Sequence, residues 1–123
     1  MSNALKQVLS QMLSRREYAV NEARSKLLQK GYQQDEVEAV VAMYVSYGWL
    51  SDERYVSAKV ASLQSRGYGP IYVKMLLGQM GLGIEPRDYC WQDAYAVAKR
   101  KAGSKEGLKL KQYLYRRGFT HAY

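Results

Sequence analysis

The chain has 123 residues, of which 47% are hydrophobic and 12% aromatic, so it has enough apolar material for a folded core and is not globally disordered. A formal net charge of +8 favours an anionic partner, which means nucleic acid, an acidic protein surface or anionic lipid. No apolar run approaches a membrane span in length, and the single Cys90 cannot close an intramolecular disulfide. We therefore expect a cytoplasmic protein without a membrane partner.

Apolar residues at helical spacing predict three helices in the first 50 residues. Residues 5–13 carry one apolar helix face, and a second helix is expected over about residues 19–30. Gly31 ends that helix, because glycine adopts the left-handed conformation of a helix end without steric cost. The stretch DEVE predicts a capping box with Asp35 as the N-cap, before a third helix that stops near Gly48.

The pattern starts again at SDERY (51–55), where Ser51 or Asp52 is expected to cap a fourth helix. GYGP (67–70) breaks this helix, and its proline suits the first turn of a fifth helix, where the missing N–H costs nothing. Gly81 is expected to close the fifth helix.

The remaining third of the chain predicts two more full helices. A short helical start at Pro86 precedes a helix over about residues 91–102, and the last helix runs from about 108 to 117 and ends at Gly118. Neither strand-like alternation nor paired hairpin turns occur in the sequence. We predict an all-α fold with helices of about 10–14 residues.

One phrase occurs three times, as KLLQKGY (26–32), MLLGQMGL (75–82) and YLYRRGF (113–119). When the copies are aligned on their glycines, apolar residues recur eight and four positions before the glycine and one position after it. A basic residue recurs seven positions before it, as Arg24, Lys74 and Lys111. Amphipathic helices that end in glycine are common, but the shared basic position favours a true repeat.

This repetition predicts tandem three-helix repeats that stack into an elongated, curved helical array. The expected boundaries are residues 1–50, 51–92 and 93–123. The opening MSNA (1–4) is interpreted as a cloning remnant with no structural role.

The excess charge lies in the last quarter of the chain. Residues 93–123 hold eight Lys and Arg against two Asp and Glu, a net charge of +6, whereas each of the other two segments has a net charge of +1. Aromatic residues are interleaved with these cations, and a basic surface with rings suits phosphate attraction combined with base stacking. A solvated helix face is the better interpretation of any single lysine, but the cluster favours an anionic partner.

No constellation for catalysis is visible. His121, the only histidine, lies near the C-terminus, and with one Cys it cannot complete a zinc site of the usual kind. We expect no catalytic residue, no cofactor and no metal, and we expect Cys90 beside Trp91 to be a packed core thiol. The carboxylates of DEVE and SDER are explained by helix starts, so the protein is expected to act by binding.

Two longer stretches resemble the RecX family, bacterial regulators of the RecA recombinase. The first is LSRREYAVNEARSKLLQKGY (13–32), and the second is YGWLSDERYVSAKVASLQSRGYGPIYVKMLLGQMGL (47–82). LKQYLYRRGF (110–119) is similar to the phrase of the family's third repeat. The likeness covers nearly the whole chain, and its motifs are specific when taken together and in this order.

The resemblance implies tandem three-helix repeats and a protein that binds the RecA–DNA filament and restrains it, and we expect the protein to be a monomer. ATP hydrolysis and strand exchange by RecA would fall, and direct contact with single- or double-stranded DNA is a further implication for DNA repair and recombination. By resemblance, Arg54 and the RGYGP stretch (66–70) lie in the most recognisable repeat. Residues 81–91 are short for the third helix of that repeat, and the last repeat is expected to be incomplete.

The hypothesis for filament or nucleic-acid contact comprises the basic residues of the repeated phrase, the motifs and the last quarter. These are Arg24, Arg54, Arg66, Lys74, Lys99, Arg100, Lys101, Lys105, Lys109, Lys111, Arg116 and Arg117. Two alternatives remain open at this point: a stand-alone basic helical module that binds nucleic acid, and an adaptor for an acidic protein surface.

Overall fold

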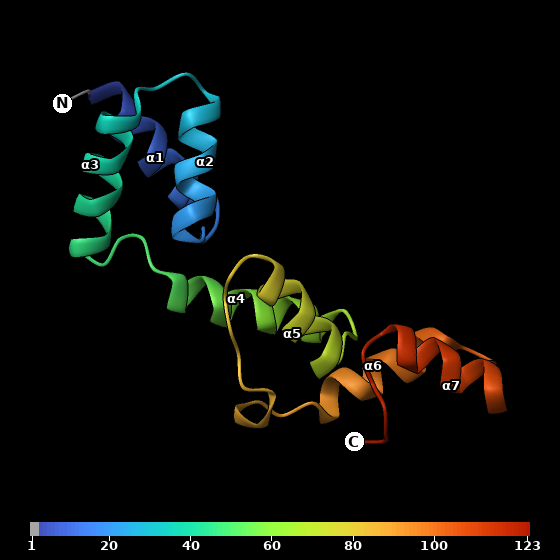
Figure 1. The fold of residues 1–123 in the computed structure, drawn as a ribbon. Coiled ribbons are helices and arrows are strands. Elements are labelled where there is room, and N and C mark those ends of the chain that lie inside the picture. The colour runs from blue at the N-terminus through green and yellow to red at the C-terminus, as the bar shows by residue number, and fades with distance from the viewer. Residues whose placement is uncertain (1–2) are drawn as a thin grey trace. The chain divides into compact units, whose positions relative to one another are not determined.

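A computed structural model describes residues 3–123 of the chain (Figure 1). Within these residues the secondary structure is entirely helical, which confirms the all-α prediction. The elements in chain order are α1 (Asn3–Arg15), α2 (Val20–Gln29), α3 (Gln34–Ser46), α4 (Asp52–Ser65), α5 (Pro70–Gln79), the 3₁₀ turn η1 (Pro86–Asp88), α6 (Gln92–Ala102) and α7 (Gly107–Arg116).

The α-helices have 10 to 14 residues each, as predicted, and their bounds lie within a few residues of the expected ones. The chain forms two compact units, one up to Tyr55 and the other from Val56 onward. The three-repeat boundaries and the stacking of repeats into an elongated array remain predictions.

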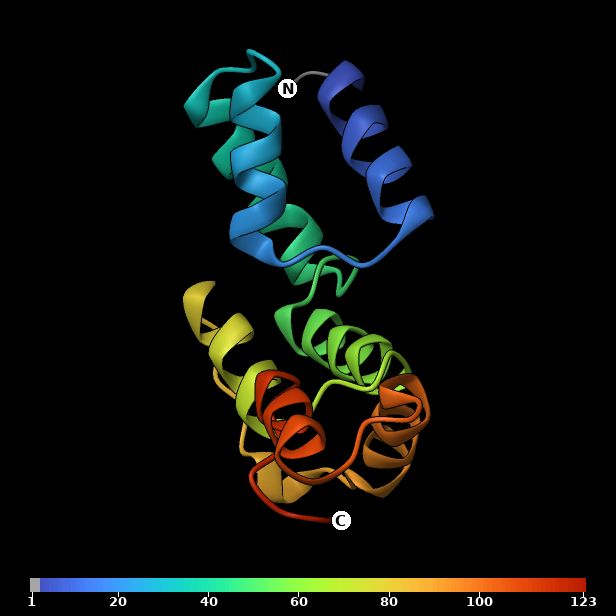
Figure 2. The same cartoon turned by 90° about the vertical axis from the view of Figure 1, so that its right-hand side faces the viewer.

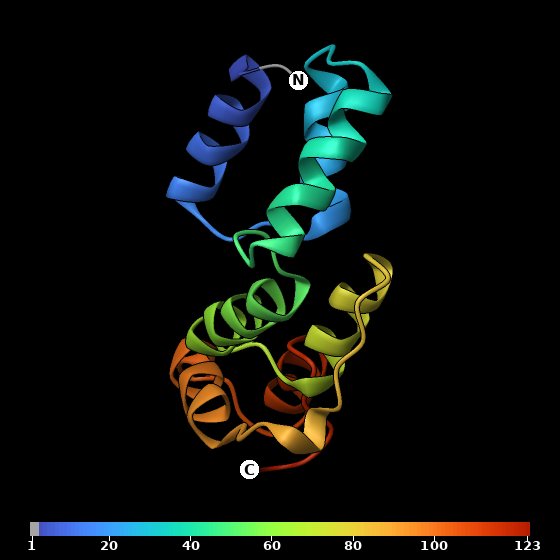
Figure 3. The same cartoon turned by 90° about the vertical axis from the view of Figure 1, so that its left-hand side faces the viewer.

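The first unit is a bundle of α1, α2 and α3, and α2 and α3 lie side by side (Figures 2 and 3). Each helix turns an apolar stripe inward, because residues three and four positions apart lie on one helix face. The buried core is formed by Leu5, Leu9, Met12, Tyr18, Ala23, Leu27, Val37, Val40, Val41, Tyr44 and Leu50. Full burial of one such leucine stabilises the fold by about 1.5–3 kcal/mol.

The second unit contains most of α4, together with α5, η1, α6 and α7, and α6 packs against α7 (Figure 2). Alanines at every fourth position of α6 allow its backbone to approach its neighbours closely, since Ala94, Ala98 and Ala102 are all buried. The larger buried side chains of this unit are Val60, Leu63, Val73, Leu77, Trp91, Leu114 and Phe119.

The three glycines of the repeated phrase end their helices as predicted. Gly31, Gly81 and Gly118 all have positive φ, and the residue after each donates its N–H to the carbonyl of the leucine four positions before the glycine. The glycine N–H bonds the carbonyl three positions back, which completes a Schellman motif at each end. The same bonds end α3 at Gly48 and α4 at Gly67, so this hydrogen-bond pattern is a general helix end in this chain.

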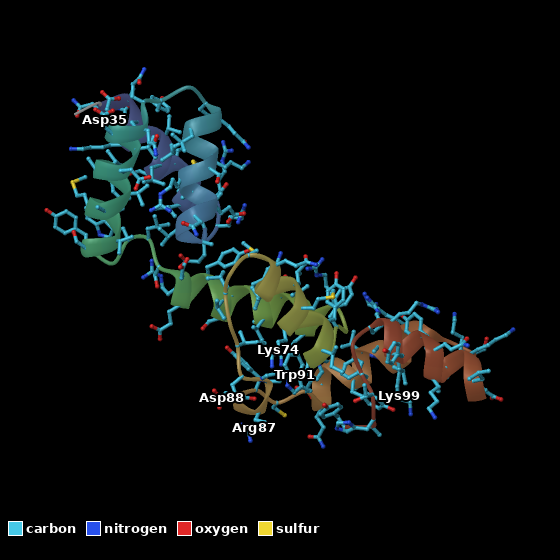
Figure 4. The ribbon with its side chains drawn as sticks, viewed as in Figure 1. Asp35, Lys74, Arg87, Asp88, Trp91 and Lys99 are labelled. Carbon is cyan, nitrogen blue, oxygen red and sulfur yellow. The ribbon has the colours of Figure 1, made fainter. Side chains whose placement is uncertain are left out.

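The predicted capping box at DEVE is wrong. The N-cap of α3 is Gln33, and Asp35 lies in the first turn of the helix (Figure 4). Glu38 instead pairs with Arg24 on α2, with 2.7 Å between Nε and Oε1. Acidic side chains still suit this helix start, because the macrodipole is positive there.

The packed thiol predicted at Cys90 is also wrong, since Cys90 is exposed. Trp91 occupies the buried place beside it, and the indole Nε1 donates a hydrogen bond to the carbonyl of Pro86 at 2.9 Å. The Cys90 carbonyl accepts from Gln64 Nε2 at 2.8 Å, so its backbone is held while its side chain faces outward.

The opening of the chain also departs from expectation. Asn3 and Ala4, expected to have no structural role, begin α1, whereas residues 1–2 lie outside the described residues. Between α5 and α6 the expected short helical start is found as η1, with no longer helix in residues 82–91.

Candidate nucleic-acid interface

The phrase GWLSDERY (48–55) lies within the first unit and connects the end of α3, the start of α2 and the first turn of α4. Ser51 Oγ accepts the N–H of Arg54 at 3.2 Å and so caps α4, as predicted for this serine. The carboxylate of Asp52 accepts a hydrogen bond at 2.7 Å from the backbone N–H of Val20, the first residue of α2. One orphan N–H of α2 is therefore satisfied by a residue 32 positions further along the chain.

Arg54 belongs to this joint. Its Nη1 donates to the carbonyl of Gly48 at 2.6 Å, and its Nε bonds Glu17 Oε2 at 3.0 Å. The guanidinium thus ties the end of α3 to the segment before α2. Arg54 remains exposed, but two of its five N–H donors are used inside the fold.

The phrase RGYGP (66–70) is a second joint, made by close backbone approach in the second unit. A Cβ on Gly67 would lie 3.0 Å from the Ala98 amide nitrogen, and one on Gly69 would lie 2.7 Å from the Gly118 carbonyl oxygen. The N–H groups of Gly69 and Ile71 donate to the carbonyls of Arg117 and Gly118, at 2.6 and 3.2 Å. Orphan donors at the start of α5 thus meet orphan acceptors at the end of α7.

A stack of cations and rings covers this second joint. Arg117 Cζ lies 4.4 Å from the ring centre of Tyr68 and 5.5 Å from that of Tyr113, and its Nε donates to Tyr113 Oη at 3.2 Å. Tyr68 stacks on Tyr72 with 4.3 Å between ring centres, and Lys105 Nζ lies 5.3 Å from the Tyr113 ring. These contacts hold Arg117 half-buried, so it has less freedom to meet a phosphate than an exposed arginine has.

The remaining candidates outside the last quarter differ in availability. Arg24 is half-buried in its ion pair with Glu38, whereas Lys74 and Arg66 are exposed. Lys74 on α5 and Lys99 on α6 come from different helices of the second unit (Figure 4). The basic residue of the repeated phrase therefore has different surroundings in the three copies. Arg24 forms an ion pair, whereas Lys74 and Lys111 are exposed.

Seven of the eight cations in residues 93–123 are exposed, and within residues 3–123 none of the seven forms an ion pair. We call them the exposed basic set: Lys99, Arg100, Lys101, Lys105, Lys109, Lys111 and Arg116. The first three lie in the last turn of α6, where cations also complement the macrodipole. This charge is not neutralised within the described chain and is available to an anion.

The three aromatic rings interleaved with these cations differ in burial and in their contacts. Phe119 is buried, Tyr113 is held by Arg117 and Lys105, and Tyr115 is 69% exposed. Leu108, also 69% exposed, lies seven positions before Tyr115 and thus on the same face of α7. Sequence reasoning did not separate these rings, although the spacing of Leu108 and Tyr115 is visible in the sequence.

The first unit exposes a ring pair that the sequence analysis did not single out. Tyr47 and Trp49 are 61% and 55% exposed and stack with 4.8 Å between ring centres. Trp49 also meets the buried Tyr44 edge to face. The pair follows directly from the helix end at Gly48, which turns the chain outward after α3.

The described residues also bear on the expectations for histidine, metal ligands and membrane spans. His121 is exposed and tilts against Tyr123, with 4.4 Å between ring centres. No cluster of three or more His, Cys, Asp or Glu able to hold a metal occurs in residues 3–123. In the same part of the chain, no helix combines the length and apolarity needed to cross a membrane.

Comparison with known proteins gives a consistent result, although no family model matches the chain. The regulatory protein RecX of Halorhodospira halophila is 30% identical over 133 positions, which cover 97% of this chain and 83% of the relative. RecX of Vibrio parahaemolyticus is 27% identical over 129 positions, with 94% and 83% covered. RecX of Xanthomonas oryzae pv. oryzae is 36% identical over 74 positions, with 60% and 46% covered.

Proposed function

The chain belongs to the RecX family of regulatory proteins, and on this basis we propose that it binds the RecA–DNA filament and restrains it. Bound protein lowers ATP hydrolysis and strand exchange by RecA during DNA repair and recombination, including the SOS response. The protein acts in the cytoplasm, as a monomer, without a cofactor and without a reaction of its own.

The structural observation that best supports the DNA contact in this proposal is the exposed basic set on α6, α7 and the turn between them. Seven cations without an ion-pair partner in residues 3–123 suit a polymer of phosphates, because each neutralised phosphate releases counterions on binding. Arg24 and Arg54 have intrachain partners, so they are weaker candidates for filament contact than the exposed set.

The test is an ATPase titration of RecA on single-stranded DNA with increasing amounts of this protein. We expect hydrolysis to fall with the wild-type protein and to fall less with a K109Q/K111Q/R116Q variant. A matched control, R15Q/K26Q/K30Q, removes three exposed cations from the first unit and should act like wild type. Unchanged hydrolysis at excess wild-type protein contradicts the proposal.

A second candidate function is a stand-alone nucleic-acid-binding module, which the net charge of +6 in residues 93–123 favours. It predicts affinity for DNA without RecA that falls steeply with salt. An adaptor for an acidic protein surface is distinguished by complexes that survive nuclease treatment.

A further inference from the structure

Helix α7 presents one continuous outward face. Leu108, Lys111, Gln112, Tyr115 and Arg116 line it together, at the spacing i, i+3, i+4, i+7 and i+8. The opposite side of α7 is anchored by the buried Leu114, and Phe119 is buried just beyond the helix. The outward face is therefore fixed in direction within the second unit.

The cations of α7 lie on both sides of the exposed Tyr115 ring. Leu108 and Tyr115 share a direction, Lys111 lies on one flank, and Lys109 and Arg116 lie seven residues apart on the other flank. Helix α7 contains no Asp or Glu, and the acid nearest to it in the sequence is Glu106 at its N-cap. The exposed ring of Tyr115 thus lies between Lys111 on one flank and the pair Lys109 and Arg116 on the other.

We propose that this face of α7 binds single-stranded nucleic acid, with Tyr115 stacking on a base while Lys111 and Arg116 contact phosphates. The inference rests on the nucleic-acid component of the proposed function. Tyr115 is the ring of α7 that remains available, since Tyr113 is occupied by Arg117 and Lys105. An aromatic ring needs an uncovered base face, which a single strand offers and a stacked duplex does not.

The same face fits a lipid surface less well. An interfacial helix buries a broad apolar face in the bilayer, together with a basic polar face. Here Leu110 and Leu114 are turned toward the unit's interior, which leaves only Leu108 and Tyr115 as large exposed apolar groups on α7. Two such groups flanked by cations suit a strand of alternating bases and phosphates better.

Anisotropy of a labelled oligo(dT), measured without RecA, tests the inference on the full chain. We expect Tyr115→Leu to weaken binding by about fivefold or more, because loss of base stacking is worth about 1 kcal/mol or more. Tyr115→Phe keeps the ring and should bind within about twofold of wild type. Affinity for a duplex of equal length should not change in Tyr115→Leu.

The charge part of the inference is tested by salt dependence. Lys111→Gln and Arg116→Gln should each reduce the slope of log affinity against log salt by about 0.7 on a single strand. Arg15→Gln and Lys26→Gln are exposed controls in the first unit and should leave the slope unchanged. Circular dichroism of every variant checks that the helices are intact.

Three results would overturn the inference: an unaltered affinity in Tyr115→Leu, an equal loss on single strand and duplex, or Tyr115-dependent binding to phosphatidylserine vesicles without binding to oligo(dT). The RecA titration distinguishes a failure of this inference from a failure of the proposed function. If the wild-type protein lowers ATP hydrolysis but Tyr115→Leu binds oligo(dT) as tightly as wild type, the inference alone fails. If oligo(dT) binding depends on Tyr115 while hydrolysis is unaffected, the proposed function alone fails.

Discussion

Gly69 and Gly118, far apart in the sequence, meet so closely that a Cβ on Gly69 would lie 2.7 Å from the Gly118 carbonyl oxygen. A Cβ on Gly118 would lie 2.6 Å from the amide nitrogen of Tyr72. The contact brings the start of α5 onto the end of α7, where donors and acceptors of the two helix ends pair. Neither glycine can gain a side chain without separating the helix ends.

Gly69→Ala should destabilise the second unit by about 1–3 kcal/mol, because the added methyl group meets backbone atoms that cannot move away alone. Thermal unfolding followed by circular dichroism measures the change. Gly78→Ala is the control, since a Cβ there meets nothing within 4 Å. Within α5 it should raise stability by about 0.5–1 kcal/mol. Equal stabilities of the two variants would contradict the close contact.

Arg116 and Arg117 are adjacent, but their substitution by Gln should affect stability differently. Arg117→Gln removes a cation between Tyr68 and Tyr113 and a hydrogen bond to Tyr113 Oη, so it should lower stability by about 1–2 kcal/mol. Arg116→Gln should leave stability within about 0.5 kcal/mol of wild type, because Arg116 is exposed and makes no ion pair within residues 3–123. Urea unfolding gives the stabilities, and DNA titration should rank the affinity losses in the reverse order.

Asp52→Ala should destabilise the first unit by about 0.5–2 kcal/mol, because the N–H of Val20 at the start of α2 loses its acceptor. Asp52→Asn keeps an acceptor oxygen and should cost less. Glu53→Ala removes an acid from the same turn of α4 and serves as the control. Denaturant unfolding followed by circular dichroism measures the losses. A loss in Glu53→Ala as large as that in Asp52→Ala would rule out this capping role.

Tyr55 should make the fold sensitive to alkaline pH. Burial raises the pKa of Tyr55 above its ordinary value near 10, and the nearby Glu22 raises it further. The folded state therefore holds this proton more tightly than the unfolded chain does. The stability contribution is complete below about pH 10 and is lost as pH rises through the folded-state pKa.

Unfolding of Tyr55→Phe across this range checks the prediction. The free energy of unfolding should fall less steeply above pH 10 in the variant than in wild type. Tyr47→Phe is the matched control, because it removes the same hydroxyl group from a ring that is 61% exposed. Identical slopes in wild type and Tyr55→Phe would contradict a role for burial.

Much of the candidate surface was predictable, because the net charge of each segment can be counted from the sequence and charged side chains are mostly exposed. The excess of cations after residue 92 is visible without coordinates, and seven of these eight cations are exposed. The role of Arg117 was not predictable, since Tyr68 reaches it from a distant part of the chain. The same holds for Arg54, whose partners Gly48 and Glu17 become neighbours only when α2, α3 and α4 meet.

The repeated phrase shows a similar limit. Its apolar residues and glycine encode a Schellman end, which is a local hydrogen-bond pattern and was therefore predictable. The ends of α3 and α4 use the same pattern without the basic residue, so the phrase alone does not establish a repeat.

The sequence by itself determined the helices of this protein to within a few residues, since the apolar period and the helix-end residues act within a few positions of one another. It also determined where the positive charge is concentrated. Tertiary structure alone decided which cations and rings remain available, because burial and stacking depend on residues that only folding brings together. Asp52 on Val20, Gly69 on Gly118 and Arg117 on Tyr68 are all contacts of this kind.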